Sequence, residues 1–201
     1  MPEDFTQFLH AYDMIPLSLA GYILGAILIL AHAIALTFPQ KVQGILSRSA
    51  RNDKAAALLL AVDFLWFAIM LGGWGPFAPM KVWLYEFEGI RGLLIILCPI
   101  TCILLITFVK DLLFPRALGM FGLLAAAPFL YAAFLEDPGT RLLIPIWCYA
   151  VITLSIFWIA KPYLYRNMVA ALLARPKLWA PLCIAGIAYG IAVLVSAILY
   201  W

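Results

Sequence analysis

Residues 41–54 read KVQGILSRSARNDK, and this basic stretch lies between two long apolar runs. It holds Lys41, Arg48, Arg51 and Lys54, whereas the runs on either side hold one charged residue, Asp63. Segments rich in Lys and Arg stay on the cytoplasmic side of a membrane, because carrying these charges across is disfavoured. The stretch therefore predicts a cytoplasmic connection between two membrane-spanning helices.

The same alternation continues along the whole chain. Ten of the 13 basic residues lie in three segments, which follow the first, third and fifth apolar runs. The other connections and the N-terminal tail are acidic, so we predict six spans with both termini outside the cytoplasm. A proline ends each of the three odd-numbered runs. A threefold internal repeat is therefore one possible interpretation of the sequence. The residues concerned are Lys110, Arg116, Lys161, Arg166, Arg175 and Lys177 for the second and third basic segments, and Pro39, Pro115 and Pro162 for the prolines.

The composition excludes a soluble domain. The chain has 201 residues, of which 67% are hydrophobic and 11% are charged, whereas about a quarter of the residues of a soluble domain are charged. The apolar runs are continuous over about 20 residues, which is the length of a membrane helix and not of a barrel strand. We predict an all-α membrane protein with one integral domain over 1–201, in which six helices form three antiparallel hairpins. The predicted spans are 15–38, 55–71, 93–109, 117–135, 142–160 and 178–201.

Two of the basic segments have the pattern of short amphipathic helices on the cytoplasmic leaflet. Val42, Ile45 and Leu46 share one helical face in the first segment, and Leu164 and Met168 share one in the last. These segments either anchor the topology or form a docking surface for a soluble partner. The excess of basic residues favours anionic lipid headgroups as a partner over nucleic acid. The acidic N-terminus is not that of a signal peptide, and the pattern of Phe5, Phe8, Leu9 and Tyr12 predicts a further short helix on the outer leaflet.

Asp63 and His32 are the candidate polar pair of the bundle. Asp63 lies about 13 Å from the start of its span at 1.5 Å per residue, near the middle of the membrane. His32 lies at a similar depth in the preceding span, which would be its hairpin partner. A paired His32 and Asp63 would form polar contacts between helices or part of a proton or cation path. Such a pair would also make Asp63→Asn better tolerated than Asp63→Leu.

Pro99 and Pro128 form a second candidate site. Each removes a backbone hydrogen bond within a span, and both lie about 9–11 Å below the outer surface. The freed carbonyls would turn toward Thr101, Tyr131, water or another helix, and they could line a cavity. The alternative is that both prolines only improve helix packing.

Small residues predict two helix-contact faces. Gly21 and Gly25 are four positions apart in the first span, as are Gly186 and Gly190 in the last. Small residues at this spacing let another helix approach closely, and that helix could belong to this chain or to another subunit. The four cysteines show no CxxC spacing, so we expect no metal site and no cofactor.

Three function classes remain open from the sequence. The first is a non-catalytic accessory or scaffold subunit of a membrane assembly, and the second is a small oligomeric transporter or channel that uses Asp63 and His32. The third is a membrane-embedded enzyme, which the scarcity of acids, bases and metal ligands disfavours. Homo- or hetero-oligomers fit each class. The charge pattern favours a bacterial inner membrane.

Overall fold

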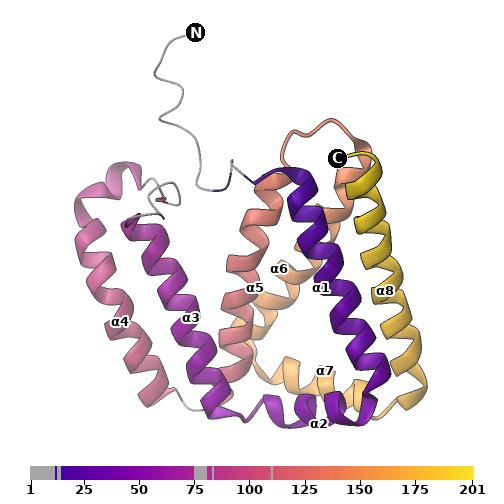
Figure 1. Ribbon diagram of the computed structural model, residues 1–201. Coiled ribbons are helices and arrows are strands. Elements are labelled where there is room, and N and C mark those ends of the chain that lie inside the picture. The colour runs from indigo at the N-terminus through magenta and orange to yellow at the C-terminus, as the bar shows by residue number, and fades with distance from the viewer. Residues whose placement is uncertain (1–11, 13–14, 75–80, 83, 110) are drawn as a thin grey trace.

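The computed structural model describes residue 12 and residues 15–74, 81–82, 84–109 and 111–201. These residues form helices and turns, with no strand among them, and six helices are long and apolar enough to cross a membrane (Figure 1). The predicted all-α, six-span fold is confirmed, and the chain is an integral membrane protein. Phe5, Phe8, Leu9 and Lys110 lie outside the described residues. The elements are α1 (Leu17–Thr37), α2 (Pro39–Ser49), α3 (Asp53–Gly72), the 3₁₀-helix η3 (Tyr85–Ile90), α4 (Arg91–Phe108), α5 (Leu113–Ala132), the 3₁₀-helix η4 (Gly139–Leu142), α6 (Leu143–Ala160), α7 (Tyr163–Leu173) and α8 (Pro176–Leu199).

The spanning helices pack as three antiparallel pairs, which are α1 with α8, α3 with α4 and α5 with α6 (Figure 1). Helix α5 joins the pairs, because it also packs against α3 and contacts α1. One apolar core lies between α1, α5, α6 and α8, and a second lies between α3, α4 and α5. The C-terminus and the start of α1 lie at one end of the bundle, the terminal end. Helices α2 and α7 cross the opposite end, which we call the basic end (Figure 1).

The predicted hairpin of the first two spans is wrong, because α5 lies between α1 and α3 (Figure 1). The reason is the length of α2, which has 11 residues. A helix of that length rises about 16 Å, whereas packed helices lie about 8–10 Å apart. Helix α2 therefore carries the chain past the nearest helix position, and α7, also of 11 residues, does the same between α6 and α8. The predicted hairpins of the third with the fourth span and of the fifth with the sixth span are not formed either, because α4 packs on α3 and α6 packs on α5.

The two glycine faces predicted from the sequence lie against each other at the α1–α8 contact. A Cβ built on Gly25 would lie 3.0 Å from the carbonyl oxygen of Gly190, and one on Gly190 would lie 3.1 Å from that of Gly25. A Cβ on Gly21 would lie 2.5 Å from the ring of Trp201. The two backbones are therefore so close that a Cβ at Gly25 or Gly190 would crowd the facing helix. The partner of each face is the other face of the same chain.

Helices α2 and α7 pack on each other at the basic end. The hydroxyl groups of Ser49 and Tyr165 lie 2.8 Å apart, and both residues are buried. Ser49 Oγ gives its hydrogen to the carbonyl oxygen of Leu46 at 2.7 Å, so the Tyr165 hydroxyl donates to Ser49. The ring of Trp158 packs edge-on against the ring of Tyr165, with 5.2 Å between the two ring centroids. These contacts join two surface helices and the end of α6 into one layer.

Candidate functional site

Asp63 is the buried acid of the membrane interior, and it lies midway along α3. Its side chain has 0% exposure, and neither carboxyl oxygen has a hydrogen-bond partner in the described part of the chain. A carboxyl group at this depth is costly unless a proton, a cation or a donor neutralises it. An unsatisfied acid of this kind marks a candidate functional site.

The surroundings of Asp63 are apolar. Leu60 and Ala56 lie on the same face of α3, one turn and two turns away from Asp63 respectively, and both belong to the core between α3, α4 and α5. Cys102 of α4, in the same core, is close enough to interact electrostatically with the Asp63 carboxyl group. The site can therefore hold a proton, but the described residues give it no hydrogen-bond donor.

His32 lies elsewhere in the bundle, so the predicted pair with Asp63 is not formed. Its Nδ1 lies 2.7 Å from the carbonyl oxygen of Leu28, one turn back along α1. A carbonyl group can only accept, so Nδ1 carries the hydrogen in this contact. The ring fills the space over Gly186 of α8, where a Cβ would collide with it. His32 therefore packs on α8, because α1 has α8 and not α3 as its neighbour.

Pro99 and Pro128 line two different grooves, one on each side of α3. Pro99 lies with Cys98 and Cys102 in a groove of about 390 Å³ between α3 and α4. Pro128 lies in a groove of about 210 Å³ between α1, α3 and α5. Apolar side chains line both grooves, and Asp63 is in neither lining. The structure thus does not bring the two prolines into one cavity, since α4 and α5 both pack on α3.

Thr101 and Tyr131 lie apart from the Pro99 groove that they were expected to serve. The side chain of Thr101 is exposed on α4. Tyr131 is 37% exposed near the terminal end, and its ring centroid lies 6.0 Å from that of Tyr12. Neither residue lines the groove at Pro99.

Ser155 of α6 is a buried polar residue that sequence reasoning missed. Its side chain has 0% exposure, and its hydroxyl group has no partner among the described residues. It packs over Gly119 and Gly122 of α5, and a Cβ on Gly119 would lie 2.7 Å from the Ser155 carbonyl oxygen. Serine is frequent at close helix contacts. The glycine pair at i and i+3 in α5 was the signal available in the sequence.

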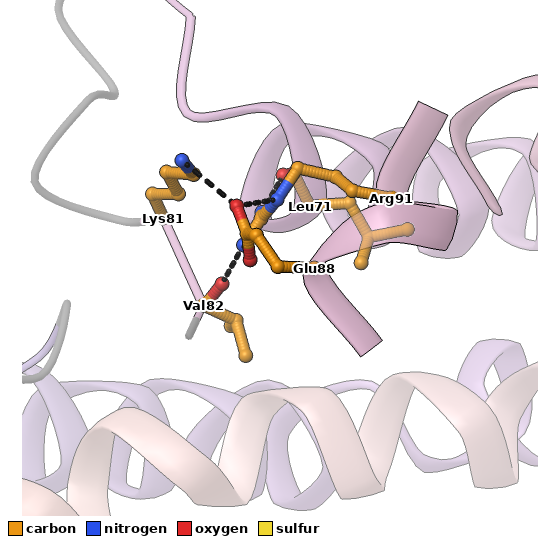
Figure 2. A network of polar contacts seen from close by, with 5 residues as sticks. All are labelled: Leu71, Lys81, Val82, Glu88 and Arg91. Carbon is orange, nitrogen blue, oxygen red and sulfur yellow. Dashed lines mark hydrogen bonds and ion pairs between the residues drawn. The ribbon is translucent and has the colours of Figure 1, made fainter. Parts of the chain in front are cut away.

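Arg91 is the centre of a polar network at the terminal end (Figure 2). Its guanidinium group donates to both carboxylate oxygens of Glu88, with Nε at 2.7 Å, and to the carbonyl oxygens of Val82 and Leu71. Lys81 adds a 3.3 Å ion pair with Glu88. Leu71 lies in the last turn of α3, where carbonyls lack helical partners, so Arg91 caps α3 while it starts α4. The network fixes the turn of the α3–α4 pair.

The basic end carries unpaired positive charge. Eight basic residues on α2, α7, their flanking turns and the first turns of α3 and α8 are exposed, and none of them forms an ion pair with another described residue. Two acids of this end, Asp53 and Asp111, are also exposed. We call these eight residues, with the layer that carries them, the basic platform. They are Lys41, Arg48, Arg51, Lys54, Lys161, Arg166, Arg175 and Lys177.

The four cysteines do not add a metal centre. Cys98, Cys102, Cys148 and Cys183 are all buried with free thiols. Among the described residues no group of three His, Cys, Asp or Glu side chains could hold a metal ion. Their burial against apolar neighbours is typical of cysteine used as a small hydrophobic residue.

No protein-family model, curated protein or solved structure matches this chain.

Proposed function

We propose that the protein is a non-catalytic accessory or scaffold subunit of a membrane assembly, whose basic platform binds an acidic segment of a partner protein. The supporting observation is that the platform is a fixed layer. The buried bond between Ser49 and Tyr165 and the ring of Trp158 hold α2 and α7 together beneath the bundle. Anionic lipid would bind basic residues on mobile helices as well as those on a fixed layer. Only a fixed array of charges, however, can match the charge pattern of one partner protein.

The charge pattern also supports an orientation. We propose that the basic platform faces the cytoplasm of a bacterial inner membrane, with both termini on the other side. All four native cysteines are buried, so single cysteines introduced on the surface report with little background. Cysteines at Arg48 and Arg175 should react with an impermeant maleimide only from the cytoplasmic side. Cysteines at Glu86 and Asp137 should react only from the other side, and labelling of all four from one side contradicts the orientation.

Photo-crosslinking in native membranes tests the scaffold role. A photoreactive amino acid at Asn167 or Ala171, both exposed on α7, should give discrete protein adducts. The matched position is Leu135 at the terminal end, which is 77% exposed and should give none. The adducts should disappear in the Arg166→Gln/Arg175→Gln variant, because the proposal needs these charges. Adducts with lipid alone, or protein adducts that survive the neutralisation, contradict the proposal.

A second candidate function is proton or cation transport, and it is favoured by the buried carboxyl group of Asp63, which has no hydrogen-bond partner among the described residues. Proteoliposomes with a pH-sensitive dye inside would test it under an imposed membrane potential. A transporter should pass protons in the wild type and lose this flux in Asp63→Asn, while Ser155→Ala, at another buried position, should keep it. Absence of wild-type flux, or equal flux in Asp63→Asn, argues against transport through Asp63.

A further inference from the structure

Helix α2 contains a glycine that its packing does not explain. Gly44 lies in the middle of this 11-residue helix, and a Cβ built on it would meet no atom of the described residues within 4 Å. Glycine weakens a helix relative to alanine, because it loses more backbone freedom on folding. Gly25 of α1 and Gly190 of α8, in contrast, are required by the backbone of the facing helix. The missing side chain of Gly44 leaves open space on the surface of the protein.

That space is the floor of a polar hollow. The hollow has a volume of about 490 Å³, which is in the range of ligand sites, about 300–1,000 Å³. Lys41 and Arg48 flank Gly44 by one turn on either side, and both side chains are exposed without an ion-pair partner among the described residues. The lining residues are Gln40, Lys41, Gly44, Ile45, Arg48 and Asn52.

The donors of the hollow suit a phosphate group. A guanidinium group binds phosphate oxygens in a bidentate way, and a lysine ammonium adds a point charge. The Asn52 side-chain oxygen already accepts from the backbone nitrogen of Ala55 at 3.1 Å, so its NH₂ group is the part left to donate. The ammonium nitrogen of Lys41, which lines the hollow, lies 5.4 Å from the centroid of the Phe38 ring. An anion over Gly44 can approach the helix backbone, since no Cβ intervenes.

The position of the hollow indicates where the phosphate comes from. Phe38 alone separates α2 from the end of the membrane-spanning α1, so the hollow lies at the level of the lipid headgroups. Ile45 in its lining is 69% exposed and Phe38 beside it is 50% exposed. Apolar side chains at this depth insert at the boundary between headgroups and acyl chains. A free phosphate ion would make no favourable contact with these apolar side chains.

We propose that the hollow formed by Lys41, Gly44, Arg48 and Asn52 is a binding site for the phosphate headgroup of an anionic phospholipid. The site depends on the membrane location of the chain and not on the proposed protein partner, so either proposal can fail without the other. Binding of this kind would hold one lipid at the junction of α1 and α2, beyond the general attraction of a basic surface.

Native mass spectrometry of the purified full-length chain, titrated with phosphatidylglycerol and with phosphatidylcholine, tests the site. The wild type should prefer phosphatidylglycerol, and Gly44→Ala should reduce that affinity while raising Tm by about 2–4 °C. Arg48→Gln should reduce the affinity about tenfold, the effect of one charge-assisted hydrogen bond. Opposite effects on binding and on stability are expected only if the glycine serves a ligand.

Two matched controls separate this site from helix stability and from net charge. Gly92→Ala changes an open glycine of α4, so it should raise Tm and leave lipid affinity unchanged. Arg166→Gln on α7 removes the same charge outside the hollow, and it should have less than a threefold effect. Equal losses for Arg48→Gln and Arg166→Gln, or an unchanged affinity in Gly44→Ala, overturn the proposal. Inorganic phosphate that competes as well as phosphatidylglycerol overturns the assignment to lipid.

Discussion

The α1–α8 contact allows a prediction with a definite sign. In Gly190→Ala the new Cβ would lie 2.9 Å from Cγ1 of Ile29 and 3.1 Å from the carbonyl oxygen of Gly25. The Ile29 side chain can rotate, but the backbone of Gly25 can only move away with its helix. Overpacking of this kind costs about 1–3 kcal/mol, and the gain in helix propensity returns about 0.5–1 kcal/mol. We expect a net loss of up to about 2.5 kcal/mol, or a Tm lower by up to about 10 °C.

Thermal unfolding in detergent, followed by tryptophan fluorescence, measures this effect. Gly92→Ala is the matched control, because its Cβ would enter open space and only the gain in propensity remains. The double variant Gly25→Ala/Gly190→Ala should cost less than the sum of the single variants, by about 0.5 kcal/mol or more. The first insertion already separates the helices, so the second meets a wider gap. An increase of Tm in Gly190→Ala equal to that in Gly92→Ala, or strict additivity, refutes the packing of these two faces.

Four further predictions concern polar groups. Ser49→Ala should destabilise more than Tyr165→Phe, because it leaves the buried Tyr165 hydroxyl without its Ser49 acceptor, at about 1–3 kcal/mol; thermal unfolding measures both. Burial raises the pKa of Tyr165, against a smaller lowering by Ser49, so the folded state holds this proton more tightly than the unfolded state. Stability should hold below the ordinary tyrosine pKa of about 10 and fall as pH rises above it, less so in Tyr165→Phe, and an identical decline in both proteins contradicts this. Arg91→Ala should lower the free energy of unfolding by about 1–3 kcal/mol. Arg91→Lys should restore only part of this loss, because lysine cannot make the bidentate contact with Glu88. If Arg91→Lys restored all of it in a denaturant titration, only the charge of Arg91 would matter. Asp63→Leu should be at least as stable as the wild type and more stable than Asp63→Asn, since Asp63 has no hydrogen-bond partner to lose in the part of the chain that the structure describes. The opposite order would reveal a donor that binds Asp63.

The spans could be predicted from hydropathy alone, but their ends could not be placed to the residue. Helix α3 starts at Asp53 and not at Ala55, because the Asn52 side chain caps it. Helix α5 starts at Leu113 and not at Ala117, with Arg116 inside its first turn. Charged residues extend helices past the apolar limit, since their ends reach the polar interface.

The neighbours of each span could not be predicted, for a physical reason. Apolar side chains that face lipid and those that face another helix are chemically alike, so hydropathy does not choose partners. The glycines at Gly25 and Gly190 indicated close contacts without saying that the two faces meet. The expected pair of His32 and Asp63 relied on adjacency in the sequence, and the length of α2 already argued against it. The exposed bases of α2 and α7 were visible in the sequence, but the buried bond from Ser49 to Tyr165 needed the fold.

The pairing of the first spanning helix with the last has a consequence for biosynthesis. Tyr22 donates to the carbonyl oxygen of Ala197, and these residues are 175 positions apart. At about 5–20 residues per second, a ribosome needs roughly 10–35 s to supply the second residue after the first. During this interval α1 is already in the membrane with its glycine face covered only by lipid or by the insertion machinery. Completion of the bundle therefore waits until α8 has been synthesised, and a product truncated before α8 would leave the membrane with an unclosed bundle that quality-control proteases can recognise.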